Sequence, residues 1–326
     1  MKNKIIVVVG PTAAGKSALA IEIARKFDGE IVSCDSMQVY KYMDIGTAKP
    51  TQNDVSLVKH HMIDIADPSD GEPFSCATFV EMAKVVIDDI ISRGKVPVLC
   101  GGTGLYIDSL VKETEFSEMD NDISYRNELF ALAEEKGNVY IHDMLKKVDP
   151  ESADSIHQNN LKRVIRALEI FKFTGKTKTE WDLESNKKES RYAPSFIGIT
   201  YKDREKLYDR IDDRVDVMMR EGLLEEATEL YNNGILKENS TAAQAIGYKE
   251  LFSVILGTSD VETAVDNIKR ETRRYAKRQM TWFKRNDLIK WFYPDEVSGE
   301  APLSTFEIIV NNVTEHLKSE GFCVII

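Results

Sequence analysis

The stretch of sequence that decides the fold is Gly10-Pro11-Thr12-Ala13-Ala14-Gly15-Lys16-Ser17. It matches the pattern G-x-x-x-x-G-K-[ST], with an apolar β-branched run at residues 4–9 before it and a helical pattern at residues 16–27 after it. In this setting the loop amides and the helix N-terminus bind a phosphate chain, Lys16 neutralises phosphate oxygens and the Ser17 hydroxyl can hold Mg²⁺. The motif predicts a phosphate site without distinguishing ATP from another phosphate donor.

Outward from this loop, short apolar strands are predicted at residues 30–34 and 96–100. A helix is predicted at 74–93, with Phe79, Met82, Val86 and Ile90 on its apolar face. Strands that alternate with helices indicate a parallel sheet covered on both faces. We therefore expect a P-loop-type α/β core. A further strand is predicted at 194–200 and helices at 206–219, 223–231, 261–282 and 305–318.

The chain becomes polar and helix-rich between these parts. Residues 116–190 carry many charges, and 159–173 read as a good helix. We interpret 116–190 as a helical insertion domain and expect residues 1–115 and 191–326 to form the catalytic core with its C-terminal helices.

Composition limits the class of protein. The 326 residues are 42% hydrophobic and 30% charged, which is typical of a soluble globular protein. No apolar run reaches the roughly 20 residues that span a bilayer. The four cysteines lack paired spacing, so we expect neither disulfides nor a zinc site, and a reducing cytoplasm fits.

The net charge of −11 argues against a protein covered by nucleic acid. Residues 269–290, however, hold nine basic side chains against Glu271 and Asp287. This basic strip is consistent with local binding of a polyanion or with a solvated helix face. Trp282 and Phe283 within it can stack on bases or belong to the core.

Polar residues follow the second and third predicted strands. Because the carboxyl ends of parallel strands share one crevice, Asp35 should lie near the phosphate loop. Its carboxylate can bind Mg²⁺, cap the next segment or act as a general base. After the third strand, Gly101-Gly102-Thr103-Gly104 offers small residues that let a ligand approach, and a hydroxyl. The adjacent His60 and His61 are interpreted as structural.

In combination, these motifs resemble the family of tRNA dimethylallyltransferases, also called tRNA isopentenyltransferases. The similarity runs from about residue 4 to 291 and rests on GPTAAGKS, CDSMQVYKYMDIGTAKP, HHMIDIADP, VLCGGTGLY, NNLKRVIRALEI, AIGYKEL and AKRQMTWFKR. The pair DSMQVY and MDIGTAKP is the most specific part. No Cys/His zinc module follows, so the bacterial type is the better match.

The resemblance implies transfer of a dimethylallyl group from dimethylallyl pyrophosphate to N6 of the adenosine 3′ of the anticodon, with release of pyrophosphate. It implies that residues 10–17 hold the pyrophosphate with Mg²⁺, that Thr103 and Arg214 contact it, and that Asp35 accepts the proton from N6.

The resemblance also implies the tRNA contacts, with residues 116–190 gripping the anticodon arm. They are Asp35, Ser36, Met37, Gln38, Thr103, Arg126, Lys162, Arg163, Arg166, Gln244, Gly247, Tyr248, Lys249, Lys277, Arg278, Gln279, Trp282 and Lys284. Asn160 stands where the family often has Asp, which leaves a helix-cap role open. A cytoplasmic monomer is expected.

Three alternatives remain open from the sequence. A nucleotide or small-molecule kinase explains the phosphate loop equally well but not the other motifs. An RNA-binding module switched by a nucleotide would bind RNA without modifying it. A prenyl transfer to free adenine nucleotides would need neither the insertion nor the basic strip.

Overall fold

The computed structural model describes residues 2–70, 74–114, 123–185, 189–237, 240–297 and 304–325. The chain divides into two compact units, Met1–Val111 with Arg191–Ile326 and Lys112–Ser190. The sequence predicts these borders at 115/116 and 190/191. The first unit is α/β and the second is helical, as their elements show.

The first unit is built on a six-stranded sheet with the order β3-β2-β4-β1-β5-β6. All of its neighbouring strands pair in parallel. The strands are β1 (Asn3–Val9), β2 (Gly29–Ser33), β3 (His60–His61), β4 (Val96–Gly101), β5 (Tyr192–Ile199) and β6 (Lys290–Phe292). The prediction of a parallel α/β sheet is confirmed.

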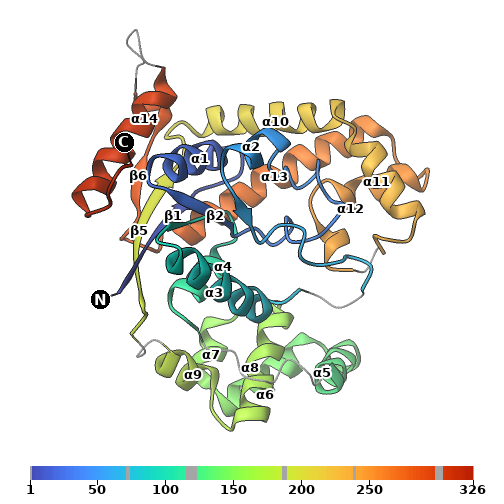
Figure 1. Cartoon of the computed structure of the whole chain (residues 1–326). Helices are drawn as coiled ribbons and strands as arrows, with labels where there is room; N and C mark the ends of the chain where they lie inside the picture. The colour runs from blue at the N-terminus through green and yellow to red at the C-terminus, as the bar shows by residue number, and fades with distance from the viewer. Residues whose placement is uncertain are drawn as a thin grey trace. The chain divides into compact units, whose positions relative to one another are not determined.

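Both faces of the sheet are buried, which explains the continuous apolar run of β1. Ile5 to Val9 have no exposed surface, as expected for a central parallel strand covered on both sides. Figure 1 shows α1 (Lys16–Lys26) on one side of the sheet and α3 (Cys76–Ser92) with α4 (Gly104–Val111) on the other. The helices α10 (Arg204–Arg220) and α14 (Thr305–Ser319) contribute to the same core cluster as α1.

The buried face of α3 differs from the predicted one. Met82 is 38% exposed and Val86 is partly exposed. The true buried side is formed by Phe79, Val80, Ala83, Ile87 and Ile90. The period of 3.6 residues places Ala83 on this side, and its small side chain gives a weak signal in the sequence.

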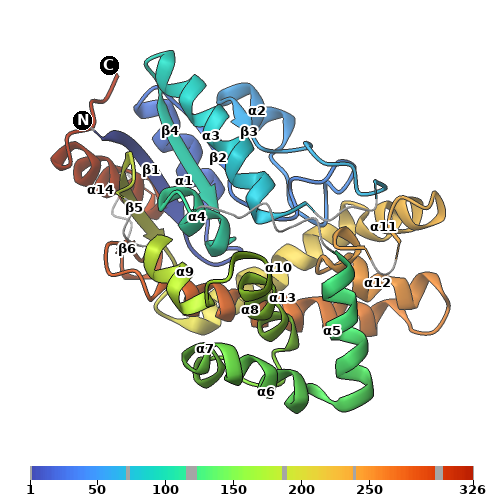
Figure 2. The ribbon, with the colours of Figure 1, turned by 90° about the horizontal axis from the view of Figure 1, so that it is seen from below.

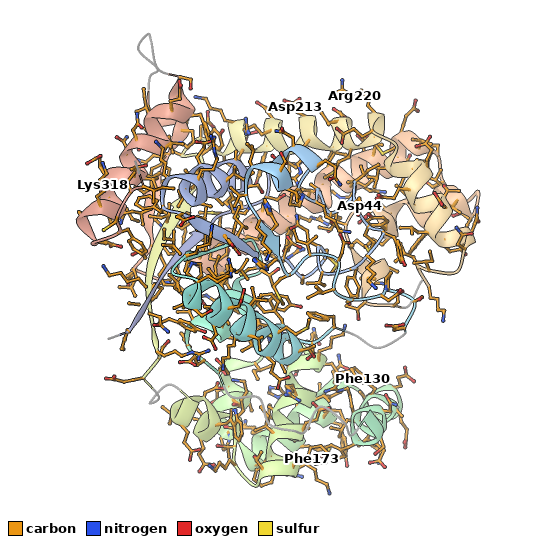
Figure 3. The ribbon with its side chains drawn as sticks, in the orientation of Figure 1. Asp44, Phe130, Phe173, Asp213, Arg220 and Lys318 are labelled. Atoms are coloured by element: carbon orange, nitrogen blue, oxygen red, sulfur yellow. The ribbon has the colours of Figure 1, made fainter. Side chains whose placement is uncertain are left out.

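The C-terminal helices enclose a second apolar cluster around Met43, Leu223 and Tyr248. Figures 1 and 2 both show α10 beside the long helix α13 (Val261–Phe283). Asp213 and Arg220 point outward from α10 (Figure 3), whereas its other side is buried. The remaining elements of this unit are α2 (Gln52–Leu57), α11 (Leu223–Asn232), η2 (Ala242–Gln244), α12 (Tyr248–Ile255), α13 (Val261–Phe283) and η3 (Pro294–Glu296).

The second unit, green in Figure 2, has its own core around Leu145 and Val164. Asp149 caps α7 by accepting a hydrogen bond from the backbone N–H of Ser152 at 3.0 Å. Asn160 precedes α8, but its side chain makes no capping bond. The helices are α5 (Ile123–Lys136), α6 (Asn138–Val148), α7 (Pro150–Ser155), α8 (Leu161–Thr174) and α9 (Lys178–Ser185). Within the described parts of the chain, no helix has the length and apolar character that crossing a membrane requires.

Candidate active site

The phosphate loop connects β1 to α1 and depends on two glycines. A Cβ atom on Gly10 would lie 2.2 Å from the carbonyl oxygen of Ile199, so the loop passes directly against β5. Gly15 has φ of +97°, in the left-handed region that disfavours other residues. The first glycine of the motif is therefore required by the close contact of the loop with β5, and the second by its left-handed backbone conformation.

Two helices from the C-terminal part hold this loop from outside. Arg210 of α10 donates from Nε to the carbonyl of Ala13 at 3.0 Å. Gln279 of α13 accepts a hydrogen bond from the backbone N–H of Thr12 at 2.8 Å. The loop geometry is thus fixed by residues about 200 positions or more away in sequence.

Lys16 begins α1 and donates from Nζ to the carbonyl of Pro11 at 2.7 Å. Burial lowers the pKa of this ammonium to about 8, with a further contribution from the nearby Arg214, although Cys100 and Asp35 act in the opposite direction. A weakly solvated cation of this kind gains most from a phosphate anion. Ser17, the next residue, lies on the wall of the cavity described below.

Asp35 follows β2 and organises a tight turn. Its Oδ1 accepts hydrogen bonds from the backbone N–H groups of Met37 at 2.8 Å and Gln38 at 3.4 Å. The capping role, one of the three that the sequence leaves open, is therefore present. Oδ2 has no hydrogen bond to any residue that the structure describes, so it is free to accept a proton.

Thr103 joins this turn to the end of β4. Its hydroxyl accepts a hydrogen bond from the N–H of Ser36 at 3.0 Å, and its own N–H donates to the carbonyl of Cys34 at 3.2 Å. The expected convergence of the two strand ends is thus seen. The Thr103 hydroxyl is engaged with Ser36, and its contact with pyrophosphate stays a prediction.

A cavity of about 500 Å³ opens beside these strand ends. Lys16, Asp35 and Arg214 line its polar part. The apolar part of the wall is formed by Ile211, Val215, Met218, Leu223, Ile246 and Ile268. A polar end that carries cations beside an apolar wall matches a ligand with a phosphate head and a hydrocarbon chain.

Arg214 has no ion-pair partner among the residues that the structure describes. Burial lowers the pKa of its guanidinium, and Asp35 opposes that shift. It forms neither an ion pair nor a hydrogen bond with any part of the chain that the structure describes. Together with Lys16 it makes this end of the cavity a site for an anion.

The residues at this end also fit Mg²⁺. Ser17 and Asp35 line the cavity, and hydroxyl and carboxylate oxygens are the ligands that Mg²⁺ prefers. The described residues contain no group of three His, Cys, Asp or Glu side chains that could hold a metal. The protein would therefore contribute few ligands, and phosphate oxygens and water would supply the others.

A carboxylate that the sequence did not single out holds the loop at residues 44–49. Glu226 of α11 accepts hydrogen bonds from the backbone N–H groups of Asp44, Ile45 and Gly46 at 3.0 to 3.2 Å. It also accepts one from the Tyr248 hydroxyl at 2.6 Å. Because Gly46 and the residues after it line the cavity, Glu226 shapes that wall from behind.

The loop is also tied to the Asp35 turn. The Gln38 amide donates to the carbonyls of Thr47 and Ala48 at 3.2 and 3.0 Å, and accepts a hydrogen bond from the Ser33 hydroxyl at 2.8 Å. The Gln38 side chain, expected to contact tRNA, is thus used within the protein. The adjacent histidines have structural partners: His60 bonds to the carbonyl of Val58 and His61 to Glu30.

The structure divides the remaining predicted tRNA contacts into exposed and buried groups. Gly247 is buried, and so are the side chains of Tyr248 and Gln279. These two side chains therefore cannot contact a tRNA that lies on the outer surface of the protein. Met37 and Lys249 are partly exposed. The exposed members are Lys162, Arg163, Gln244, Lys277, Arg278 and Lys284.

Two predicted contacts in the second unit share one buried carboxylate. Glu169 has 2% of its surface exposed. Arg126 binds it with Nε and Nη2 at 2.6 and 3.0 Å, and Arg166 approaches it at 3.4 Å. Both guanidinium groups are therefore held in place by the core of this unit.

The basic strip is neutralised at its N-terminal end. Lys269 pairs with Asp216 at 2.6 Å and Arg273 with Asp212 at 2.5 Å. By contrast, Lys277, Arg278, Lys284 and Arg285 form no ion pair with the described residues. The free positive charge is thus concentrated in the last turns of α13 and just beyond.

Trp282 is partly buried and packs against the loop that follows β4. Its Nε1 donates to Asp108 at 2.9 Å, and its ring lies where a Cβ atom on Gly104 would come within 2.2 Å. Phe283 is buried. The core role that helical spacing favours for aromatic residues is therefore seen for Phe283, and a contact of Trp282 with tRNA stays a prediction.

Comparison with known proteins agrees with this geometry. The sequence model of the family described as IPP transferase matches residues 38–286. The tRNA dimethylallyltransferase of Caldanaerobacter subterraneus subsp. tengcongensis is 47% identical over 97% of this chain and 98% of that protein. That of Acetivibrio thermocellus is 47% identical over 98% of this chain and 99% of the relative.

Solved structures show the same relationship. The full-length tRNA isopentenylpyrophosphate transferase of Bacillus halodurans matches with a TM-score of 0.70 and 42% identity, covering 98% of each chain. A eukaryotic dimethylallyltransferase acting on tRNA matches with a TM-score of 0.75 and 33% identity, covering 86% of this chain and 70% of that one. The chain therefore belongs to the IPP transferase family, and it is a transferase of that family.

Proposed function

We propose that the protein transfers a dimethylallyl group from dimethylallyl pyrophosphate to N6 of the adenosine 3′ of the anticodon in tRNA. The observation that carries this proposal is the pair of cations, Lys16 and Arg214, at the polar end of a cavity with an apolar wall. The tRNA-modifying activity that the names of the relatives state supports the acceptor.

The reaction exchanges one bond for another. The N6 nitrogen forms a bond to C1 of the dimethylallyl group while the bond from C1 to the pyrophosphate oxygen breaks. The electron pair of that bond leaves with the pyrophosphate. Asp35 accepts the N6 proton on Oδ2, while its Oδ1 keeps the bonds from Met37 and Gln38 that hold the carboxylate in place.

The protein stabilises the departing charge. Lys16, Arg214 and the loop N–H groups face the pyrophosphate, where these fixed charges and donors stabilise the negative charge that develops as it leaves. Mg²⁺, held by Ser17 and pyrophosphate oxygens, would neutralise part of the same charge. The apolar wall places the hydrocarbon chain, so positioning and electrostatics carry the rate.

The tRNA would meet exposed cations of this chain. Lys277, Arg278 and Lys284 supply unpaired positive charge on and just after α13, and Lys162 and Arg163 are exposed in the second unit. The base would leave its stack to reach the Asp35 carboxylate. The predicted donor-site residues Lys16, Asp35 and Arg214 line one cavity within a single chain, so the reaction needs no residue from a second copy, and we propose that the protein acts as a monomer. A tRNA acceptor and free thiols are consistent with action in the cytoplasm.

The kinase alternative is not favoured, because the relatives that match nearly the whole chain are named as transferases of a prenyl group.

The experiment that tests the proposal supplies the protein with Mg²⁺, labelled dimethylallyl pyrophosphate and unmodified tRNA, without a nucleotide. We expect label at the adenosine beside the anticodon, and none with Lys16→Ala. Absence of label with the wild-type protein, together with ATP-dependent phosphate transfer, would refute it.

A further inference from the structure

Gln279 lies in the last two turns of α13, yet only 5% of its surface is exposed. Both ends of its amide are used. Oε1 accepts a hydrogen bond from the backbone N–H of Thr12 at 2.8 Å, and Nε2 donates to the carbonyl of Gly102 at 3.1 Å. One side chain therefore joins the phosphate loop to the loop that follows β4.

The glycines of that second loop accommodate α13. A Cβ atom on Gly102 would come within 2.0 Å of Gln279 Nε2, and one on Gly104 within 2.2 Å of the Trp282 ring. Gln279 and Trp282 are three positions apart and thus share a helix face. From the sequence, Gly102 and Gly104 are expected to be small so that a ligand can approach. In the structure, their small size lets helix α13 approach instead.

Tyr275, one turn earlier on α13, lies beside this contact, and its side chain lines the cavity. Burial raises the pKa of its phenol to about 12, whereas the neighbouring Thr103 and Gln279 side chains lower it. The Thr103 hydroxyl in turn accepts the N–H of Ser36, the residue after Asp35. The Gln279 amide therefore connects the phosphate loop to the loop that follows β4, and Thr103 of that second loop connects it to the Asp35 turn.

We propose that Gln279 is a positioning residue for the pyrophosphate of the prenyl donor, and not a contact for tRNA. The inference rests on the proposed function and names the part of the reaction that this residue serves. Thr12 belongs to the loop whose amides form the phosphate cradle, so its orientation sets the shape of that cradle. Gly102 also lines the cavity, so its position affects the shape of the cavity wall.

An amide is needed because the two partners differ. Thr12 offers a donor and Gly102 an acceptor, and only a group that both accepts and donates satisfies the two. Gln279→Glu keeps the length but sets a buried oxygen against the Gly102 carbonyl. Gln279→Met keeps a similar length and loses both bonds. Neither change alters the exposed side of α13, where Lys277 lies.

The test measures two affinities on one set of variants. Calorimetry gives the Kd for pyrophosphate with Mg²⁺, and filter binding gives the Kd for unmodified tRNA. We expect Gln279→Glu and Gln279→Met to weaken pyrophosphate binding about tenfold, as loss of a buried hydrogen bond does, with the tRNA Kd unchanged. The matched control Lys277→Ala should weaken tRNA binding and leave the pyrophosphate Kd unchanged.

Gly102→Ala provides an independent route, because its Cβ would displace the same amide. It should reproduce the pattern of the Gln279 variants. A merely structural role would lower the active fraction, and hence kcat, without changing either KM, whereas positioning raises the KM for the donor.

Two results would overturn the inference. One is wild-type pyrophosphate affinity in folded Gln279 variants, with folding checked by circular dichroism. The other is a loss of tRNA affinity in those variants equal to that of Lys277→Ala. Failure of the wild-type protein to bind pyrophosphate at all would be a different result, since it would refute the proposed function and the inference with it.

Discussion

Replacing Asp35 with Asn separates its chemical role from its structural one. The Asp35 turn is held by Oδ1, which accepts N–H groups from Met37 and Gln38. An Asn side chain has an oxygen at the same place and can keep both bonds. It cannot accept the N6 proton, because its second position carries a neutral NH₂ group. Asp35→Ala, in contrast, removes the turn bonds and the base together.

The two variants should therefore share one effect and differ in another. A general base contributes roughly 10²- to 10⁴-fold, so both variants should lose about 3 to 5 kcal/mol of transition-state stabilisation. The two turn bonds contribute about 1 kcal/mol each. We expect Asp35→Ala to lower the free energy of unfolding by about 1–2 kcal/mol, and Asp35→Asn to change it by less than about 0.5 kcal/mol.

Single-turnover transfer with excess protein over labelled tRNA reports the chemical step. Filter binding and urea unfolding then give the tRNA Kd and the stability of each variant. Both variants should bind tRNA like the wild type. A single-turnover rate for Asp35→Asn within about threefold of the wild type would refute Asp35 as the base, since that factor is below the smallest effect of a general base.

Three further predictions concern charge and packing. Because the pKa of Lys16 is lowered to about 8, its ammonium loses a proton as the pH rises through that value. In the wild-type protein kcat/KM for the donor should therefore fall above pH 8, whereas in Lys16→Arg it should stay constant up to pH 9. The same fall above pH 8 in Lys16→Arg would contradict this. Replacing Lys277 and Arg278 with Ala should reduce the slope of log Kd for tRNA against log salt by about 1.5, whereas an unaltered slope would assign them to a solvated face. Tyr248→Phe should lower the free energy of unfolding by about 1.5 kcal/mol, because it removes the charge-assisted hydrogen bond to Glu226. Urea unfolding measures this change, and an unchanged midpoint would disprove the prediction.

The central strands and their connection to the phosphate loop follow from the sequence, because buried parallel strands are continuous apolar runs. The edge strands do not. β3 is the pair His60–His61, and β6 is Lys290–Phe292. Strands of two or three polar or aromatic residues have no recognisable period, and they form only because β2 and β5 offer them an edge.

The site shows the same limit. Asp35 and Thr103 can be placed together from strand order, since each follows a strand of one parallel sheet. The supporting groups Glu226 and Gln279 lie 182 positions from Asp44 and 267 from Thr12. Neither has a local signal, because a Glu in α11 or a Gln in α13 looks like any solvated helix residue. Their burial and their partners are properties of the tertiary structure.

In the function proposed above, the phosphate loop holds the leaving pyrophosphate of a prenyl donor and not ATP. The most direct measurement counts both products of one reaction that contains the protein, Mg²⁺, dimethylallyl pyrophosphate, unmodified tRNA and ATP. Pyrophosphate release is assayed enzymatically, and modified adenosine is quantified by mass spectrometry of the digested tRNA. We expect one pyrophosphate for each N6-dimethylallyl adenosine, with ATP intact. Consumption of ATP while the adenosine stays unmodified would contradict it.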